Sequence, residues 1–444
     1  MDSATISRRF IEYYQGEGFR LLPRAPMLDD SIPMSFVMSA GLVQIETSLA
    51  GEANRDGNQF VLVQNCFRHF DLGTVGKDST HLSFFEMPGA FTFGPNNKPI
   101  TIQRMWFLAT EVLGLPKERI WATYFKGGKI MQNEMAADAT TRQAWLELGL
   151  PAERVFGLES NNFWIQGRGV ENMTLPRKCG PNTELFLDRG AEKACGPTCY
   201  PGCGCERFVE FSNSLFISYI LDEQKRELRP ILEPFTETVI GTERVAMLLQ
   251  NAPTVFEIDR YQPILAALRS FPTQANLPAP LRLISERVIA DYAKALYCLI
   301  ADGAPPPGKN GRERIIKQLI RGVLTHQHIL GITDSDFLTV LFGIVADNVS
   351  AVSREARIRE KVKHYFLLET RRFGQTLERG QQVLNQFLSE NPNQTLSGTQ
   401  IAELEKDHGY PHNLVAARLW ERGLPFLESD YYQALRLWKE TVLN

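Results

Sequence analysis

The sequence predicts an α+β fold, in which a mixed, mainly antiparallel sheet with flanking helices occupies residues 1–250 and an all-helical domain occupies residues 251–444. Two observations predict it. Between residues 36 and 93, short β-rich runs alternate with Gly and Asp breaks, which is typical of sheet-building segments. From residue 264 to residue 387, nearly every apolar run instead has the 3.6-residue period of a helix.

The first half is expected to begin with a helix. Apolar residues from Phe10 to Phe19 have helical spacing, Gly18 ends the run, and an extended segment follows over residues 20–23. Further helices are expected over residues 101–113 and 133–148, and strands within residues 36–38, 60–63, 82–87, 90–93, 207–211 and 236–239. Strands interrupted by inserted helices are typical of a mixed domain built on a largely antiparallel sheet.

Composition and charge restrict the class of protein. The 444 residues are 43% hydrophobic and 22% charged, as in an ordinary globular protein of two or three domains. Because no apolar run approaches the roughly 18 residues that span a bilayer, we expect a cytoplasmic protein without a membrane partner. The net charge of −3 argues against a DNA partner, yet residues 281–444 carry 21 Lys and Arg against 19 Asp and Glu. A local basic face there could hold RNA phosphates.

Two segments carry residues suited to binding a nucleotide. Gln64–Arg68 and then Leu82–Gly94 place an arginine on one strand and an aromatic and acidic cluster on the next. A guanidinium pairs with phosphate and a ring stacks on a base, although a hydrophobic hairpin with a surface arginine has the same pattern. In the second segment, Phe235–Gln250, Arg244 lies between a strand and a helix, where it could reach a polyphosphate.

These two segments, in this order and spacing, resemble motifs 2 and 3 of class II aminoacyl-tRNA synthetases. Their amino-acid sequences resemble those of the alanyl-tRNA synthetase family in particular. Further matches are Met38–Leu42, Gly114–Trp121, Asn162–Trp164, Leu299–Gly303 and Thr376–Gly380. The resemblance implies the class II synthetase fold and the activation of a small amino acid, alanine or similar, with ATP and Mg²⁺. The aminoacyl group would then pass from the adenylate to the 3′ end of a tRNA.

The resemblance also assigns roles to residues. Arg68 would bind the α-phosphate and the substrate carboxylate, and Arg244 would hold the γ-phosphate, which makes these two arginines the catalytic pair. Phe85 would stack on adenine, with Glu86 in the same nucleotide-binding set, and Glu210 would bind Mg²⁺. The positions that match the amino-acid pocket, besides Arg68, are Trp164, Asn213, Leu215, Glu237 and Val239. Fixed cations that stabilise the displaced pyrophosphate suffice for such chemistry, without a covalent nucleophile.

The chain departs from the family in one loop and around the substrate. The loop after Arg68 is shorter and lacks the family's Gly-Gly-Lys, so a catalytic lysine is missing unless His69 or Lys77 replaces it. In the pocket, Leu215 stands for a Val, Glu237 for an Asp, Val239 for a Gly, and Ser212 for a Trp. The added bulk predicts a preference for glycine or another very small amino acid over alanine, although Ser212 would open space. Without the family's editing domain, proofreading in cis is not expected.

Four of the seven cysteines, separated by Gly and Pro turns, lie within eleven residues: Cys195, Cys199, Cys203 and Cys205. Four thiolates so close together can form a tetrahedron around Zn²⁺. We therefore prefer a structural zinc, with free thiols as the alternative and Cys179 as a substitute ligand. The paired histidines His326 and His328 are instead expected on a solvated helix end.

A basic stripe is expected near the start of the first long helix after residue 304. Its candidate RNA-contacting residues are Asn310, Arg312, Arg314, Lys317 and Arg321. Such a stripe can follow an RNA backbone, although the charges alone equally fit a solvated helix face. The resemblance places this segment in a domain that recognises the tRNA acceptor stem, with Asn310 near a base-reading position. At a second such position the chain has Lys406 where the family has an Asp.

Three functions stay open on the sequence alone. The first is a ligase that forms an aminoacyl-adenylate and charges a tRNA. The second is a paralogue that adenylates an amino acid for a carrier protein, a metabolite or a natural product. The third is a regulator that binds ATP or an amino acid without catalysis, which the intact Arg68, Phe85, Glu210 and Arg244 disfavour.

Overall fold

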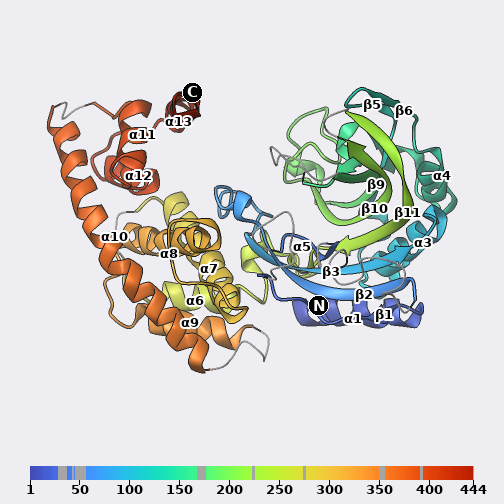
Figure 1. Cartoon of the computed structure of the whole chain (residues 1–444), viewed down its shortest axis with the longest axis horizontal. Helices are drawn as coiled ribbons and strands as arrows, with labels where there is room; N and C mark the ends of the chain where they lie inside the picture. The colour runs from blue at the N-terminus through green and yellow to red at the C-terminus, as the bar shows by residue number, and fades with distance from the viewer. Residues whose placement is uncertain are drawn as a thin grey trace. The chain divides into compact units, whose positions relative to one another are not determined.

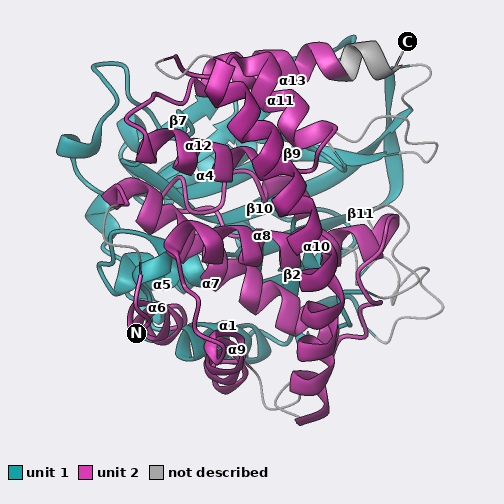
Figure 2. Cartoon of the chain, turned by 90° about the vertical axis from the view of Figure 1, so that its left-hand side faces the viewer, with its two compact units in different colours: residues 1–68, 84–259 teal, residues 69–83, 260–444 magenta. Residues whose placement is uncertain are grey.

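A computed structural model describes residues 1–28, 38–42, 45, 57–167, 177–222, 226–273, 277–349, 356–390 and 394–443. The chain divides into two compact units, which Figure 2 colours teal and magenta. Unit 1 comprises residues 1–68 and 84–259, and unit 2 comprises residues 69–83 and 260–444. The strand expected at residues 36–38 lies outside the described residues, except for Met38.

Across its described residues, unit 1 contains a nine-stranded, mainly antiparallel sheet with the order β1-β2-β3-β11-β10-β9-β4-β7, and β8 beside β9. The strands are β1 (Arg20–Leu21), β2 (Gln59–Phe67), β3 (Phe84–Phe93), β4 (Ile120–Phe125), β7 (Val155–Leu158), β8 (Phe163–Ile165), β9 (Arg177–Asp188), β10 (Phe208–Asp222) and β11 (Glu227–Ile240). β1 pairs in parallel with β2, and β4 with β7. A separate hairpin joins β5 (Gly128–Ile130) to β6 (Asn133–Met135).

Helices line the outer side of the curved sheet, as Figure 1 shows for α1, α3 and α4. The helices of unit 1 are α1 (Ser3–Gly16), α3 (Lys98–Phe107), α4 (Ala139–Glu147) and α5 (Thr242–Leu249). The helix expected from residue 133 begins only at Ala139, because the Asp138 carboxylate accepts the backbone N–H of Thr141 at 3.2 Å and caps it there. The strands expected at 82–87 and 90–93 are one strand, since Pro88 and Gly89 pair with β2 inside the ladder.

The two faces of the sheet differ in chemistry. One face carries an apolar cluster that includes Phe60, Leu62, Phe91, Leu215 and Phe235. The opposite face is rich in hydroxyl groups and lies under helices: the Ser214 hydroxyl bonds to the Met105 sulfur of α3 at 3.4 Å and to the Thr238 hydroxyl at 2.8 Å. Because side chains alternate along a strand, each strand residue belongs to one face or the other.

Unit 2 is helical, so the fold class expected from the sequence is confirmed: a mixed, mainly antiparallel sheet with helices, followed by a helical region. Its helices are α6 (Gln262–Arg269), α7 (Ala279–Ala301), α8 (Gly311–Leu330), α9 (Phe337–Asp347), α10 (Ala356–Glu390), α11 (Gly398–Lys406), α12 (His412–Glu421) and α13 (Glu428–Leu443). α7 is buried at every residue from Ser285 to Ile300 and forms the centre of this unit. Among the described helices, none has the length and apolarity that a bilayer span requires.

Residues 69–83 join unit 2 although they lie between two strands of unit 1. Within unit 2, the Tyr292 hydroxyl donates to the Leu72 carbonyl at 2.9 Å, and the Ser83 backbone N–H donates to the Asp291 carboxylate at 3.1 Å. Gly76 has φ +81° and approaches α7 so closely that an added Cβ would lie 3.1 Å from the Ile284 carbonyl oxygen. The conformation of this loop is thus set by its contacts with α7.

Candidate active site

Strand register brings most of the predicted site residues to the face of the sheet that carries the apolar cluster. Phe91 of β3 is paired with Glu237 of β11, and Val239 lies between Gly89 and Asn213. Directly paired residues point to the same side of an antiparallel ladder. The same pairing puts Phe85, opposite Cys66, on this face.

Arg68 directly follows β2 and marks one end of the site. Its guanidinium carbon lies 4.8 Å from the centroid of the Phe85 ring, a cation–π contact. Its Nε donates to the Ser39 carbonyl at 3.4 Å, which links it to the Met38–Leu42 segment. The guanidinium and the ring therefore lie against each other at this end of the face.

Arg244 and two glutamates mark the other end of the site. Arg244 lies in the first turn of α5, directly after β11, and its Nη1 contacts Glu210 through the carboxylate at 3.1 Å and the carbonyl at 3.2 Å. The Glu184 carboxylate accepts from the amides of Asn182 at 3.2 Å and Asn213 at 3.1 Å. Burial, and then the charge of Glu210, raise the pKa of Glu184 well above its usual value.

Sequence reasoning missed Glu184. The available signal was the polar run Asn182-Thr183-Glu184 inside β9, in which Asn182 and Glu184, two positions apart, share one face. Pairing of Asn213 with Glu184 and of Leu215 with Asn182 puts both polar side chains on the site's face.

The predicted amino-acid residues lie beside the apolar cluster. Glu237 is 3% exposed and sits between Phe91 and Leu215 in the ladder, and Leu215 is 5% exposed. Trp164 of β8 packs against the same cluster. The arrangement provides one buried carboxylate beside apolar side chains, which could pair with an ammonium group.

Two expected pocket residues lie on the helix-covered face instead. The Glu86 carboxylate accepts from the Ser7 hydroxyl of α1 and, at 3.2 Å, from the Thr242 hydroxyl of α5. Ser212 is 4% exposed, and its hydroxyl donates to the Val239 carbonyl at 2.9 Å. Glu86 follows Phe85, and Ser212 precedes Asn213, so strand alternation directs both away from the nucleotide and amino-acid positions.

Lys77, one of the two suggested replacements for the missing lysine, is held by α13 within unit 2. Its ammonium contacts the Glu428 carboxylate at 3.3 Å and the Tyr432 hydroxyl at 3.2 Å. Hydrogen bonding to Tyr432 and Glu428 outweighs partial burial, so the pKa of Lys77 is raised. His69, the other suggested replacement, is exposed.

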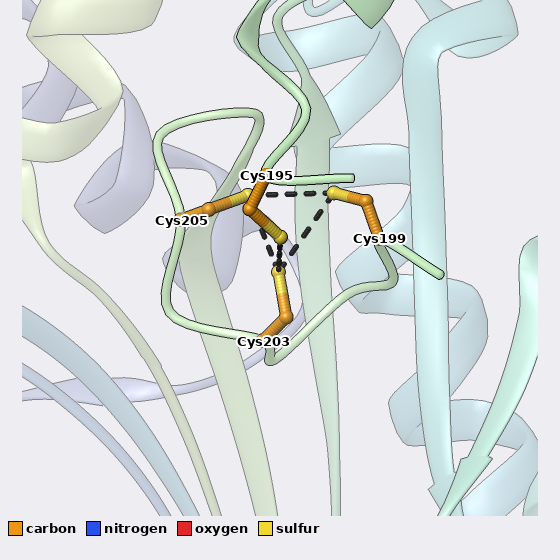
Figure 3. A group of neighbouring side chains, drawn as sticks. All are labelled: Cys195, Cys199, Cys203 and Cys205. Carbon is orange, nitrogen blue, oxygen red and sulfur yellow. Dashed lines mark hydrogen bonds between the residues drawn. The ribbon is translucent and has the colours of Figure 1, made fainter. Parts of the chain in front are cut away.

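The four cysteines of residues 195–205 converge on one point (Figure 3). Their Sγ atoms all lie within 4.8 Å of one another, with separations of 3.8 Å for Cys195–Cys203 and 3.4 Å for Cys199–Cys205. Four sulfurs at about 2.3 Å from a tetrahedral Zn²⁺ would be about 3.8 Å apart, so the set fits the ion. Cys179 does not belong to this group: it is a buried β9 residue whose thiol faces the Tyr219 carbonyl at 3.6 Å.

The expected RNA stripe is only partly present on α8. Asn310 and Arg314 are exposed, and burial together with the neighbouring Arg321 and Arg314 lowers the pKa of Lys317. Arg321, however, pairs at 2.6 Å with Glu369 of α10, a residue that is 1% exposed, so it holds two helices together. Arg312 lies in the first turn of α8 and is half-buried.

The expectation for His326 was wrong. This α8 residue is 3% exposed, and its Nδ1 lies 3.0 Å from the Ser285 hydroxyl of α7. Burial lowers the pKa of His326 to about 3, so the ring is neutral inside the helical core.

A mixed, mainly antiparallel sheet with flanking helices, followed by a helical region, is the architecture of the class II synthetase catalytic fold. Over residues 5–441 the chain matches the family model described as tRNA synthetases class II (A), and it belongs to that family.

Its relatives include the alanine–tRNA ligases of Alkaliphilus oremlandii (strain OhILAs), 30% identical over 432 residues, and of Nitrosococcus oceani, 32% identical over 440 residues. These matches cover 96% and 98% of this chain but 47% and 48% of the relatives, so the chain spans about half their length. Solved structures that resemble it include the apo histidyl-tRNA synthetase of S. aureus, with 14% identity, a TM-score of 0.34 and coverage of 58% of this chain and 68% of that one.

Proposed function

We propose that this chain activates a small amino acid with ATP to form an aminoacyl-adenylate and transfers the aminoacyl group to the 3′ end of a tRNA. The observation that carries the proposal is the shared face of the sheet, where Phe85, Asn213 and Glu237 lie in register, Arg68 contacts the Phe85 ring and Glu210 is paired with Arg244. Such a face offers cations, a stacking ring and a carboxylate to one bound ATP and one amino acid.

The two arginines supply fixed positive charge. Arg68 would hold the α-phosphate and the substrate carboxylate, which brings the attacking oxygen to the phosphorus, and its stacking partner Phe85 would receive adenine. Arg244 would exchange its contact with Glu210 for the γ-phosphate, where a preorganised cation stabilises the departing pyrophosphate. Mg²⁺ bound with ATP would neutralise phosphate charge, and Glu210 is the ligand we assign to it, with Glu184 as its neighbour.

The amino acid would be very small. Glu237 would receive its ammonium group, and the buried Leu215 with Val239 would close the space around its side chain. Because Ser212 lies on the opposite face, its small size adds no space to the pocket. One methylene is worth about 1–3 kcal/mol of discrimination, so glycine is expected to be preferred over alanine without excluding it.

The acceptor is proposed to be RNA because α8 presents Asn310, Arg314 and Lys317 at its first turns. The four cysteines are proposed to hold one structural Zn²⁺, since no catalytic side chain lies among them.

ATP–pyrophosphate exchange with glycine, alanine, serine and β-alanine, each with and without tRNA, tests the activity. Exchange with a small amino acid that disappears in Arg68→Ala is expected, and transfer of label to tRNA would establish the acceptor. Exchange without transfer would identify a paralogue with another acceptor. Tight ATP binding without exchange would refute adenylation and leave a regulator.

A further inference from the structure

The long helix α10 has two faces of different character. Its inner face is apolar and buried, and includes Ile358, Val362, Phe366, Phe373 and Leu377. Figure 1 shows the helix along one edge of unit 2. A helix that packs on one side only must direct its other side to solvent or to a partner.

A buried ion pair fixes which side faces outward. Arg321 of α8 contacts Glu369 of α10 at 2.6 Å, and its guanidinium carbon lies 4.9 Å from the centroid of the Phe373 ring. Glu369 is 1% exposed, so a rotation of α10 that broke the pair would leave the Glu369 carboxylate buried without its cation, which is unfavourable. The arginine expected to bind RNA from α8 thus sets the orientation of the neighbouring helix.

The outer face is basic. Arg371, Arg372, Gln375 and Arg379 are exposed and, at 3.6 residues per turn, fall within an arc of about 100°. Arg357 and Lys361 continue the face toward the start of α10, which gives it a length of about 33 Å at 1.5 Å per residue. We name this set the α10 basic face.

The central arginines of this face are available to a ligand. Within the described chain, Arg371, Arg372 and Arg379 form no ion pair with a carboxylate. Glu360 and Glu378 border the face, and Glu360 is already engaged by Lys363 at 3.5 Å. Ion pairs in the described part of the chain therefore do not neutralise the charge of these three arginines.

We propose that the α10 basic face binds the phosphate backbone of an RNA, beyond the contacts assigned to α8; the inference rests on the proposed RNA acceptor. Several cations along about 33 Å of rigid helix suit a polyanion with regularly repeated charges. A lipid surface would need several exposed apolar side chains beside the charges. The apolar face of α10 is buried, and beside the basic face lie one exposed leucine, Leu367 at 71%, and the half-buried Leu368.

The test compares RNA binding by the full chain and by the variant Arg371→Gln/Arg372→Gln/Arg379→Gln. The probe is a fluorescent RNA hairpin with an unpaired 3′ end, followed by anisotropy across a sodium chloride series. Each phosphate contact contributes roughly 0.7–0.9 to the slope of log affinity against log salt, so three lost contacts reduce the slope by about 2. Near 0.1 M salt this corresponds to a loss of affinity of about 100-fold.

The control variant removes three exposed cations of unit 1, Arg8→Gln/Lys129→Gln/Arg142→Gln, and is expected to bind RNA as the parent does. Pyrophosphate exchange by the α10 variant should be unchanged, which separates this inference from adenylation. Equal RNA affinity in the parent and the α10 variant, or equal losses in both variants, would overturn the inference. So would binding of phosphatidylserine vesicles that depends on the same arginines at the same salt concentration.

Discussion

Glu184 is a half-buried carboxylate that links β9 and β10 at the proposed site. The Asn182 and Asn213 amides donate to it, and the charges of Glu210 and Arg244 act on it. Glu184→Gln keeps the shape and an acceptor for both amides but removes the ionisable group that interacts with Glu210 and Arg244. Because both amide hydrogen bonds are kept and only the interaction inside the site is lost, pyrophosphate exchange should fall roughly 10- to 100-fold, about 1.4–2.7 kcal/mol, with the melting temperature little changed. The exposed Glu153→Gln is the control, and full exchange in Glu184→Gln would remove this residue from the site.

His326 makes the stability of the helical unit depend on pH. Its pKa is lowered from 6.5 to about 3 by burial, so between these values the unfolded chain binds a proton that the folded chain does not. The stability is therefore complete above about pH 6.5 and falls with pH, by about 1.4 kcal/mol per pH unit from this group. Denaturant titrations from pH 7 to pH 4 should show a flatter profile in His326→Gln than in the exposed control His364→Gln. Parallel profiles would show that His326 does not carry the dependence.

Single residues also show what the sequence could and could not predict. Motif resemblance named both Phe85 and Glu86, but adjacent strand residues face opposite sides, and the partners of Glu86 on α1 and α5 are more than 70 positions away in the chain. Helical spacing correctly places Arg314, Lys317 and Arg321 near one face. It cannot reveal that Glu369, 48 positions later, pairs with Arg321.

At the scale of elements, the cysteine segment is expected to depend on its metal. Strands β9 and β10 are joined at its base by the pair of Asp188 and Arg207, at 2.9 and 2.7 Å, so these strands should survive its loss. We expect about one zinc per chain in protein purified without added zinc, and loss of that zinc with a lower melting temperature in Cys203→Ser. Cys179→Ala should keep its zinc. A metal-free parent chain with full exchange activity would dismiss the site.

The sequence predicts whether an element is a helix or a strand where the apolar residues repeat regularly over several helical turns or strand alternations, as in α1 and α7. Their ends were set by contacts that are less visible in a sequence. Asp138 starts α4, and β6 occupies Asn133–Met135 ahead of it, inside the range expected to be helical. The pair Pro88–Gly89 reads as a break but lies within β3, because β2 and β11 pair with that strand on its two sides.

At the scale of the whole molecule, residues 69–83 belong to one unit by their position in the chain and to the other by their packing. Chain order suggests that all residues before 250 belong to the sheet domain, whereas this loop packs on α7, through Leu72, Gly76 and Ser83. Nothing local in the loop's sequence identifies α7 as its support. The loop lies between Arg68 and Phe85, so both ends of the proposed nucleotide motif are connected to a segment that unit 2 shapes.

A fragment of residues 1–259 is therefore expected to lose pyrophosphate exchange although it keeps every residue assigned to ATP and the amino acid. Without Asp291 and Tyr292, the loop loses its bonds at Ser83 and Leu72, and we expect the two strand ends that carry Arg68 and Phe85 to be held less firmly. Because such a fragment can simply fail to fold, two variants of the full chain test the same point. Ser83→Ala removes the hydrogen bond that the Ser83 hydroxyl donates to the Asp291 carboxylate, and Tyr292→Phe removes the bond to the Leu72 carbonyl.

An unpaired buried polar group costs about 1–3 kcal/mol, so either variant should lower exchange several-fold while the chain still melts cooperatively. The exposed Ser389→Ala is the control. Exchange at the parent's rate in the fragment would show that the sheet unit shapes its own loop, whereas exchange lost in the fragment and reduced in both loop variants would establish that α7 supports the nucleotide motif.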